Sequence, residues 1–219
     1  MAYGGLITDS NGRNWITPDA PTLNLVNRFQ WTLPASGQLN AFINTGISQN
    51  QMCVIFIKQL NGNQTFNGRM VKLGGTWQYD VLSAGTGGFA NPTASTFMVY
   101  VFSNLVPTSE FWGMAVYNAS GKMTWNATMI PLEIKRYDIP LTERPITLPH
   151  GCAVMPGASQ WALIYEDGVS YYYSSSFNAR GNLIERASTQ VEDGVYANEN
   201  EGVINRTCYY INTDVYDSY

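Results

Sequence analysis

The sequence repeats its opening segment about half-way along the chain. The first copy runs from Tyr3 to Arg13, and the second, 109 residues later, runs from Trp112 to Lys122. Each contains an aromatic residue, glycine, an apolar stretch, a turn with Asp or Asn that closes on glycine, and a cation; a tryptophan follows, Trp15 or Trp125. Two copies are too few for a solenoid. We interpret them as one strand–turn–strand element that opens and closes a single β unit.

Short apolar stretches separated by turn residues predict an all-β fold. Gly, Pro, Asn and Ser break the pattern roughly every eight to twelve residues, and turns such as Asn61-Gly62 tolerate the positive φ of tight hairpins. In Thr96–Ser103 both alternating faces are apolar, which predicts a central strand covered on both sides, and Met52–Ile57 has the same pattern. Two packed sheets satisfy such strands, so we expect a β-sandwich-like N-terminal domain.

The pattern predicts fifteen strands along the chain. They are Tyr3–Thr8, Arg13–Ile16, Leu23–Phe29, Leu39–Asn44, Met52–Gln59, Arg69–Leu73, Trp77–Leu82, Thr96–Ser103, Gly113–Tyr117, Lys122–Asn126, Pro131–Asp138, Ala158–Glu166, Ser170–Ser175, Arg186–Val191 and Val203–Thr213.

The composition of the sequence changes near residue 140, where prolines become frequent. Pro140, Pro145 and Pro149 follow one another closely, and proline cannot donate to a strand ladder. We therefore expect a β-sandwich domain over residues 1–138, a proline-rich linker over 139–150, and a smaller tyrosine-rich β unit over 151–219. The last part is acidic: residues 141–219 contain ten Asp or Glu and four Arg.

Composition excludes several classes of partner. Charged residues make up 13% of the chain, about half the usual share, and no stripe of Lys and Arg occurs, so we expect no nucleic acid. No apolar stretch reaches the roughly 18 to 20 residues of a membrane span. The N-terminus has neither a basic segment nor a long apolar run, so we expect no secretion signal and a soluble chain made in the cytoplasm.

The three cysteines and the single histidine indicate no catalytic or metal site. Cys53 lies in an apolar strand and is expected in the core, whereas Cys152 and Cys208 are expected as free thiols, with pairing in an oxidising setting as the alternative. His150 lies two positions from Cys152, but no third orienting group accompanies them, and we expect a turn or edge histidine. One histidine and no CxxC spacing make zinc improbable, and no cofactor motif occurs. We therefore predict no metal, no cofactor and no catalytic residues.

Carboxylates in the acidic part leave one enzymatic alternative open. Glu166, Asp167, Glu192 and Asp193 include pairs that could act as acid and base on a glycosidic bond. Solvated loop carboxylates are the other interpretation.

Aromatic residues are concentrated in the last third of the chain. Three consecutive tyrosines on a strand cannot all point inward, because successive side chains face opposite sides. Exposed Tyr and Trp suit contacts with sugars or protein partners; the alternative is that half of them fill a core. The predicted contact residues are Trp161, Tyr165, Tyr171, Tyr172, Tyr173, Tyr209 and Tyr210.

The repeated element carries a resemblance to a known family. The opening Met-Ala-Tyr-Gly, a short apolar strand, the Asp-Ser-Asn-Gly turn and the following aromatic residue resemble small tailed-bacteriophage tail proteins encoded near the tail-fibre and host-specificity genes. In that family a similar unit recurs near the end of the domain, here Trp112 to Gly121. The resemblance covers about residues 1–137; the extra glycine in Gly4-Gly5 and the one-residue difference in spacing to the tryptophan depart from it.

The resemblance implies a virion protein of the tail tip or tail fibre, with no enzymatic activity. Its partners would be other tail proteins and a host surface protein or glycan, and family analogy favours a homotrimer. Two alternatives stay open: a tail-associated polysaccharide hydrolase, and an assembly factor absent from the mature particle.

Overall fold

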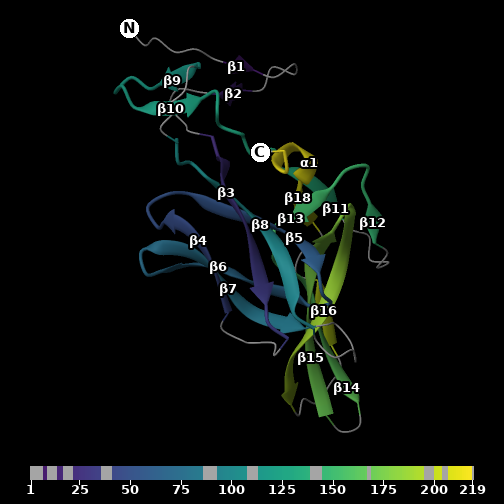
Figure 1. Cartoon of the computed structure of the whole chain (residues 1–219). Helices are drawn as coiled ribbons and strands as arrows, with labels where there is room; N and C mark the ends of the chain where they lie inside the picture. The colour runs from purple at the N-terminus through teal and green to yellow at the C-terminus, as the bar shows by residue number, and fades with distance from the viewer. Residues whose placement is uncertain are drawn as a thin grey trace.

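The computed structural model of the protein is almost entirely β-structure, so the all-β prediction is confirmed (Figure 1). It describes residues 7–8, 14–16, 22–35, 41–85, 93–107, 113–138, 145–166, 169–194, 200–203 and 207–218. Within these residues the only helix is the single turn α1 (Thr213–Tyr216).

Eighteen strands are present in the described residues. They are β1 (Ile7–Thr8), β2 (Asn14–Ile16), β3 (Asn24–Leu33), β4 (Ala41–Ser48), β5 (Cys53–Asn61), β6 (Thr65–Leu73), β7 (Thr76–Gly85), β8 (Ser95–Ser103), β9 (Ala115–Tyr117), β10 (Met123–Asn126), β11 (Lys135–Asp138), β12 (Ile146–Thr147), β13 (Cys152–Val154), β14 (Ala158–Glu166), β15 (Val169–Arg180), β16 (Leu183–Gly194), β17 (Asn200–Val203) and β18 (Thr207–Asn212). Each strand expected from the sequence overlaps one of these, whereas β12 and β13, which flank Pro149, are not predicted.

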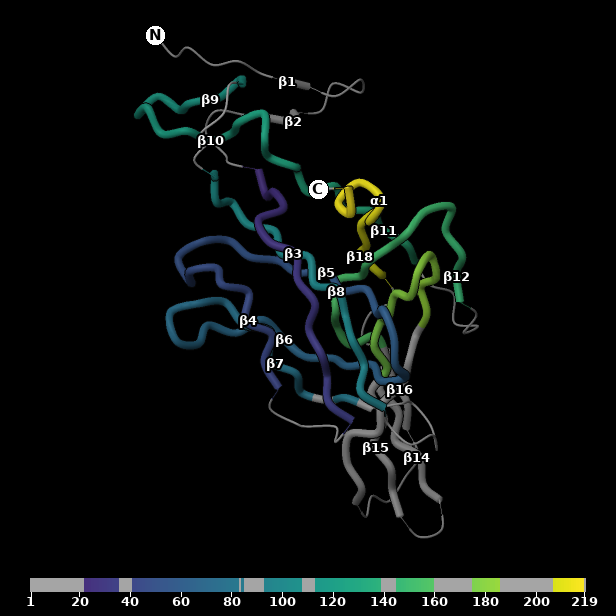
Figure 2. Tube along the Cα trace, in the orientation of Figure 1, coloured from purple at the N-terminus to yellow at the C-terminus, as the bar shows by residue number. Residues whose placement is uncertain are grey.

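A three-stranded sheet packs on one face of a larger sheet and forms the main core. β7 lies between β4 and β6, and β8 lies between β3 and β5 in the other layer (Figure 2). Tyr79 and Val81 of β7 share one buried cluster with Phe97 and Val99 of β8. The ring of Phe66 lies 4.9 Å from that of Phe97, edge to face. Alternate residues of each strand therefore fill the space between the layers.

The opposite face of β8 is also buried. Phe56, Tyr100 and Phe102 have no exposed surface and form a second cluster with Ile211 of β18 and Tyr216 of α1. The rings of Phe102 and Tyr216 meet edge to face at 5.1 Å. The sequence-based prediction that Thr96–Ser103 forms a central strand covered on both sides is confirmed.

Strands from both sides of residue 140 share the larger sheet. β13 pairs with β18 and reaches β5 through Val154 and Ile57, and β15 reaches β5 through Arg180 and Gln59. Of the expected linker, residues 139–144 lie outside the described part, and Ile146–Thr147 forms β12 against β16. The expected boundary at residue 138 therefore does not separate two sheets, because the chain re-enters the same ladder after its prolines.

The two copies of the repeated element form hairpins with the same register. Ile7 pairs with Ile16 and Thr8 with Asn14 in β1–β2; 109 residues later, Val116 pairs with Trp125 and Tyr117 with Met123 in β9–β10. Both ladders shift between these two pairs, which places Trp15 and Thr124 at equivalent bulges. The two paired strands expected in each copy are confirmed, and the turn of the first copy lies outside the described residues. Trp125 corresponds to Ile16, so the two tryptophans are not equivalent.

One buried amide joins the early and late strands. Gln59 is 1% exposed, and its Oε1 accepts hydrogen bonds from Asn178 Nδ2 at 2.8 Å and Arg180 Nη2 at 2.9 Å. Its Nε2 donates to the backbone oxygens of Asn61 and Gln64 at 3.3 and 3.0 Å. All the polar valences of this side chain are satisfied, as burial requires.

Replacing Phe97 with alanine tests the main core. Phe97→Ala removes a fully buried ring, so we expect the free energy of unfolding to fall by about 3–5 kcal/mol in urea denaturation. Phe42→Ala is the matched control, because Phe42 is 38% exposed and should change stability by less than about 1 kcal/mol. Equal losses for both variants would contradict the assignment of the core.

Candidate functional site

The β14–β15 hairpin brings together most of the aromatic residues that we expected to contact a partner. Trp161 and Tyr165 belong to β14, and Tyr171–Tyr173 to β15. The cross-strand pairs include Trp161↔Ser174, Ala162↔Tyr173, Leu163↔Tyr172, Ile164↔Tyr171 and Tyr165↔Ser170. Because paired positions share a face, Trp161, Tyr165 and Tyr172 occupy positions of one face and Tyr171 and Tyr173 positions of the other. Five of the seven predicted contact residues therefore lie on one hairpin.

Tyr209 and Tyr210 have opposite environments on β18. Tyr210 is 8% exposed, belongs to the main core and stacks on His150 with ring centroids 6.2 Å apart. Its expected role as a contact residue is therefore corrected: its side chain faces the sandwich interior. Tyr209 is 40% exposed and remains available to a partner.

A small mixed surface surrounds Tyr209. Its strand neighbour in β11 is Arg136, and its backbone oxygen accepts a hydrogen bond from Met155 N at 2.8 Å. Arg136 forms a two-pronged ion pair with Asp138, whose Oδ1 also accepts from Thr207 Oγ1 at 2.7 Å. The hydrogen bonds from Thr207 and Arg136 lower the pKa of Asp138. We call Tyr209, Arg136, Asp138 and Met155 the Tyr209 surface; it offers an aromatic ring beside fixed charges.

Cys152 is not a nucleophile in this environment. Its side chain has no exposed surface, and its Sγ lies 3.5 Å from the backbone oxygen of Leu183. Burial raises the pKa of Cys152 to about 11, so the thiol stays protonated at neutral pH. His150 Nδ1 lies 3.0 Å from the backbone oxygen of Gly151, and its ring stacks on Tyr210. These contacts are consistent with a structural role for His150.

All three cysteines are free thiols. In the β13–β18 ladder Cys152 lies opposite Asn212, so Cys208 is four residues, roughly 13 Å, further along the partner strand. A disulfide needs Cα atoms within about 7 Å. The register therefore excludes the alternative of a Cys152–Cys208 bond.

No group of metal-ligating side chains occurs in the part of the chain that the structure describes. None of its described helices is long and apolar enough to cross a membrane. Of the carboxylates considered for glycosidic cleavage, Glu166 ends β14 and Glu192 and Asp193 lie in β16, whereas Asp167 falls outside the described residues.

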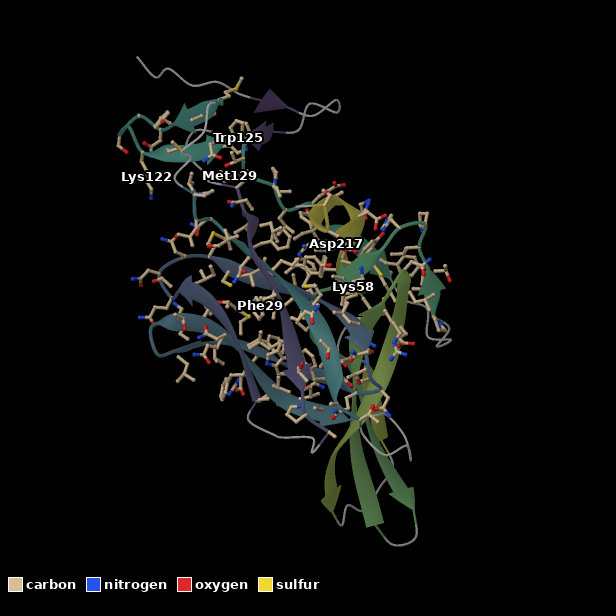
Figure 3. The ribbon with its side chains drawn as sticks, in the orientation of Figure 1. Phe29, Lys58, Lys122, Trp125, Met129 and Asp217 are labelled. Carbon is tan, nitrogen blue, oxygen red and sulfur yellow. The ribbon has the colours of Figure 1, made fainter. Side chains whose placement is uncertain are left out.

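The sequence gives no signal for an ionic cluster that closes the fold at α1. Asp217 Oδ1 accepts from Tyr100 OH at 2.7 Å and pairs with Arg28 Nη1 at 3.2 Å, and its Oδ2 pairs with Lys58 Nζ at 3.3 Å (Figure 3). Lys58 also donates to Thr213 Oγ1 at 3.1 Å. Burial, and then the hydrogen bond to Asp217, raises the pKa of Tyr100. Because both carboxylate oxygens already accept hydrogen bonds, this cluster acts as a clamp between α1 and β3, β5 and β8.

The β9–β10 hairpin lies outside the sandwich (Figure 1). Two of its apolar side chains are exposed, Met114 at 63% and Tyr117 at 52%. The turn between the strands is held by Asn118, whose Oδ1 accepts from Ser120 N at 3.1 Å and Lys122 N at 2.9 Å. Gly121 closes it with φ +77°, which explains the glycine of the repeat. Sequence reasoning treated this element as structural and missed its exposed surface, which its low charge could have indicated.

Comparison with known proteins assigns no family. No family model, no curated protein and no solved structure matches the chain.

The buried thiols predict a loss of stability at alkaline pH. Burial raises the pKa of Cys152 and Cys208 from 9.0 to about 11 and 12. Above pH 9 the unfolded chain releases protons that the folded chain retains, so the free energy of unfolding should fall as pH rises from 9 to 12. Urea denaturation across this range measures the fall, and Cys208→Ala should make it smaller, because Cys152 is then the only one of the two thiols that contributes. A stability that rises with pH there would contradict this prediction.

The Asp217 clamp should contribute more to stability than a surface ion pair. Asp217→Ala leaves Arg28, Lys58 and Tyr100 without their shared acceptor, and we expect a loss of roughly 1–3 kcal/mol in thermal unfolding. Asp138→Ala is the control, because it breaks an exposed pair with Arg136 and should cost less than about 1 kcal/mol. If the two variants unfold alike, the clamp is not a stabilising element.

Proposed function

We propose that this chain is a non-enzymatic virion protein of a bacteriophage tail, associated with the tail tip or tail fibre, that assembles as a homo-oligomer and contributes to attachment to the host. The repeated hairpin is the observation that carries the proposal, because the resemblance to tail proteins rests on that motif. The two pairs of β1–β2 have register equivalents among the three pairs of β9–β10, which supports a motif with a defined structural role.

The Tyr209 surface and the β14–β15 hairpin support a role in attachment. Tyr209 presents an exposed ring beside the Arg136–Asp138 pair, and the hairpin carries Trp161, Tyr165 and Tyr171–Tyr173 in paired strands. Aromatic rings beside oriented charges suit a sugar or a protein surface. The partner proposed for these surfaces is a host surface protein or glycan, and the other proposed partners are tail proteins of the same particle.

One observation favours the hydrolase alternative. Glu166 pairs with Val169, and Asp193 pairs with Tyr171, so the two carboxylates occupy positions on the same face of β14 and β16 with β15 between them. An acid and base on a polysaccharide would need such convergence. Release of reducing ends from host polysaccharide, abolished in Glu166→Gln and Asp193→Asn, would favour this alternative over the proposed function.

Location and cell binding test the proposed function together. We expect mass spectrometry to find the chain in purified particles of the phage that encodes it, and we expect the purified full chain to bind host cells. Tyr209→Ser should weaken that binding about tenfold or more, as loss of a tyrosine anchor does. Phe42→Ser is the matched control, since Phe42 is 38% exposed and lies in the other sheet.

The outcomes separate the parts of the proposal. Absence from particles would reject the tail assignment and favour an assembly factor. Presence in particles without cell binding would reject the attachment role and leave a structural tail protein.

A further inference from the structure

The two hairpins leave their strand edges open. β1–β2 and β9–β10 are separate two-stranded sheets, and within the described residues neither is hydrogen-bonded to a third strand or to the other hairpin. A two-stranded hairpin is marginally stable in water unless another strand or surface packs against it. An open edge is also a template for pairing with a further strand. These elements therefore have the geometry of docking elements.

From this arrangement we infer that the hairpins couple neighbouring copies of this chain. In the inferred contact, β9–β10 of one chain adds edge to edge to β1–β2 of a second copy, as in strand addition. The inference deepens the homo-oligomer of the proposed function by naming its surface, but it does not require a virion.

The composition of the second hairpin fits a buried contact. Residues 113–126 contain one charged residue, Lys122, and include Met114 and Met123. Interface cores are depleted of charge and enriched in Met and aromatic residues. Met114 and Tyr117 are 63% and 52% exposed in the isolated chain, although they lie on an element that joins neither core cluster.

Side-chain hydrogen bonds hold the hairpin at both of its ends. Asn118 ties the turn through Ser120 and Lys122, and Asn126 ties the far end, because its Oδ1 accepts from Thr128 N at 3.0 Å and its Nδ2 donates to the backbone oxygen of Pro107 at 2.8 Å. A preorganised element loses little conformational entropy when it binds.

The duplication bears on the occupant of each edge. β1–β2 and β9–β10 share the register of two residue pairs and an equivalent bulge, so each hairpin can offer the other a strand edge with the same spacing of backbone groups. A head-to-tail contact uses each hairpin of every chain once, so a ring of chains closes with no hairpin unpaired. A contact between two β9–β10 hairpins would leave β1–β2 without a partner.

Charge insertion at exposed positions tests the contact. We expect the full chain to sediment as a closed oligomer in analytical ultracentrifugation, and Met114→Lys with Tyr117→Glu to weaken association at least about tenfold, since interface anchors of this kind are worth 1.4 kcal/mol or more. Met52→Lys is the matched control: Met52 is 59% exposed but lies at the sandwich, and this variant should assemble normally. A monomeric wild-type chain, or equal dissociation of the control, would overturn the inference.

Mixing two variants distinguishes the pairing of unlike hairpins from other contacts. Thr8 is the register equivalent of Tyr117, so Thr8→Glu should disable the first hairpin as Tyr117→Glu disables the second. Each variant alone should lose the closed oligomer, and an equimolar mixture should form a heterodimer through its intact β9–β10 and β1–β2 hairpins. If Thr8→Glu leaves the oligomer intact, or if the mixture forms no heterodimer, the head-to-tail contact is refuted. Far-ultraviolet circular dichroism of each variant establishes that it is folded.

Discussion

Burial of β8 on both faces is the constraint on which the rest of the structure depends. Phe97 and Val101 point to one side and Tyr100 and Phe102 to the other, and none of them has exposed surface. Burial of each such side chain contributes about 1.5–3 kcal/mol of favourable free energy relative to leaving it exposed to water. The chain must therefore provide a cover for each face, which β4, β6 and β7 supply on one side and α1, with Ile130 and Leu132, on the other.

The second cover comes from the far end of the sequence, so polar links over long sequence separations have to hold it in place. Gln59 satisfies Asn178 and Arg180, and Asp217 satisfies Arg28 and Lys58. An unpaired polar or charged group in these positions would raise the free energy of the folded chain. The hydrogen bonds and ion pairs offset that cost only when the early and late segments lie together. Hydrophobic burial thus provides the driving force, whereas these contacts fix which segments meet. A division of the chain near residue 140 would break both.

Local sequence patterns predicted the individual strands, but they did not predict which distant segments of the chain pack together. Alternation and turn residues were sufficient for every expected strand and for the two-sided burial of Thr96–Ser103, because both depend on neighbouring residues. The prolines after Ile139 predict an interruption between strands, but they do not reveal whether the chain returns to the same sheet. Similarly, Tyr209 and Tyr210 look alike in sequence, and only the placement of β18 against β13 decides which is exposed. No sequence signal links Arg28, Lys58 and Asp217.

The exposed surfaces of this protein have two different physical origins. The Tyr209 surface continues the sheet that holds the second core, so its geometry is fixed by the same packing that stabilises the fold. The β9–β10 hairpin belongs to neither core cluster, and its Met114 and Tyr117 side chains are exposed. The two surfaces therefore differ in what holds them in place. Packing of the sheet fixes the Tyr209 surface, whereas the β9–β10 hairpin is held by its own ladder and by the hydrogen bonds of its turn.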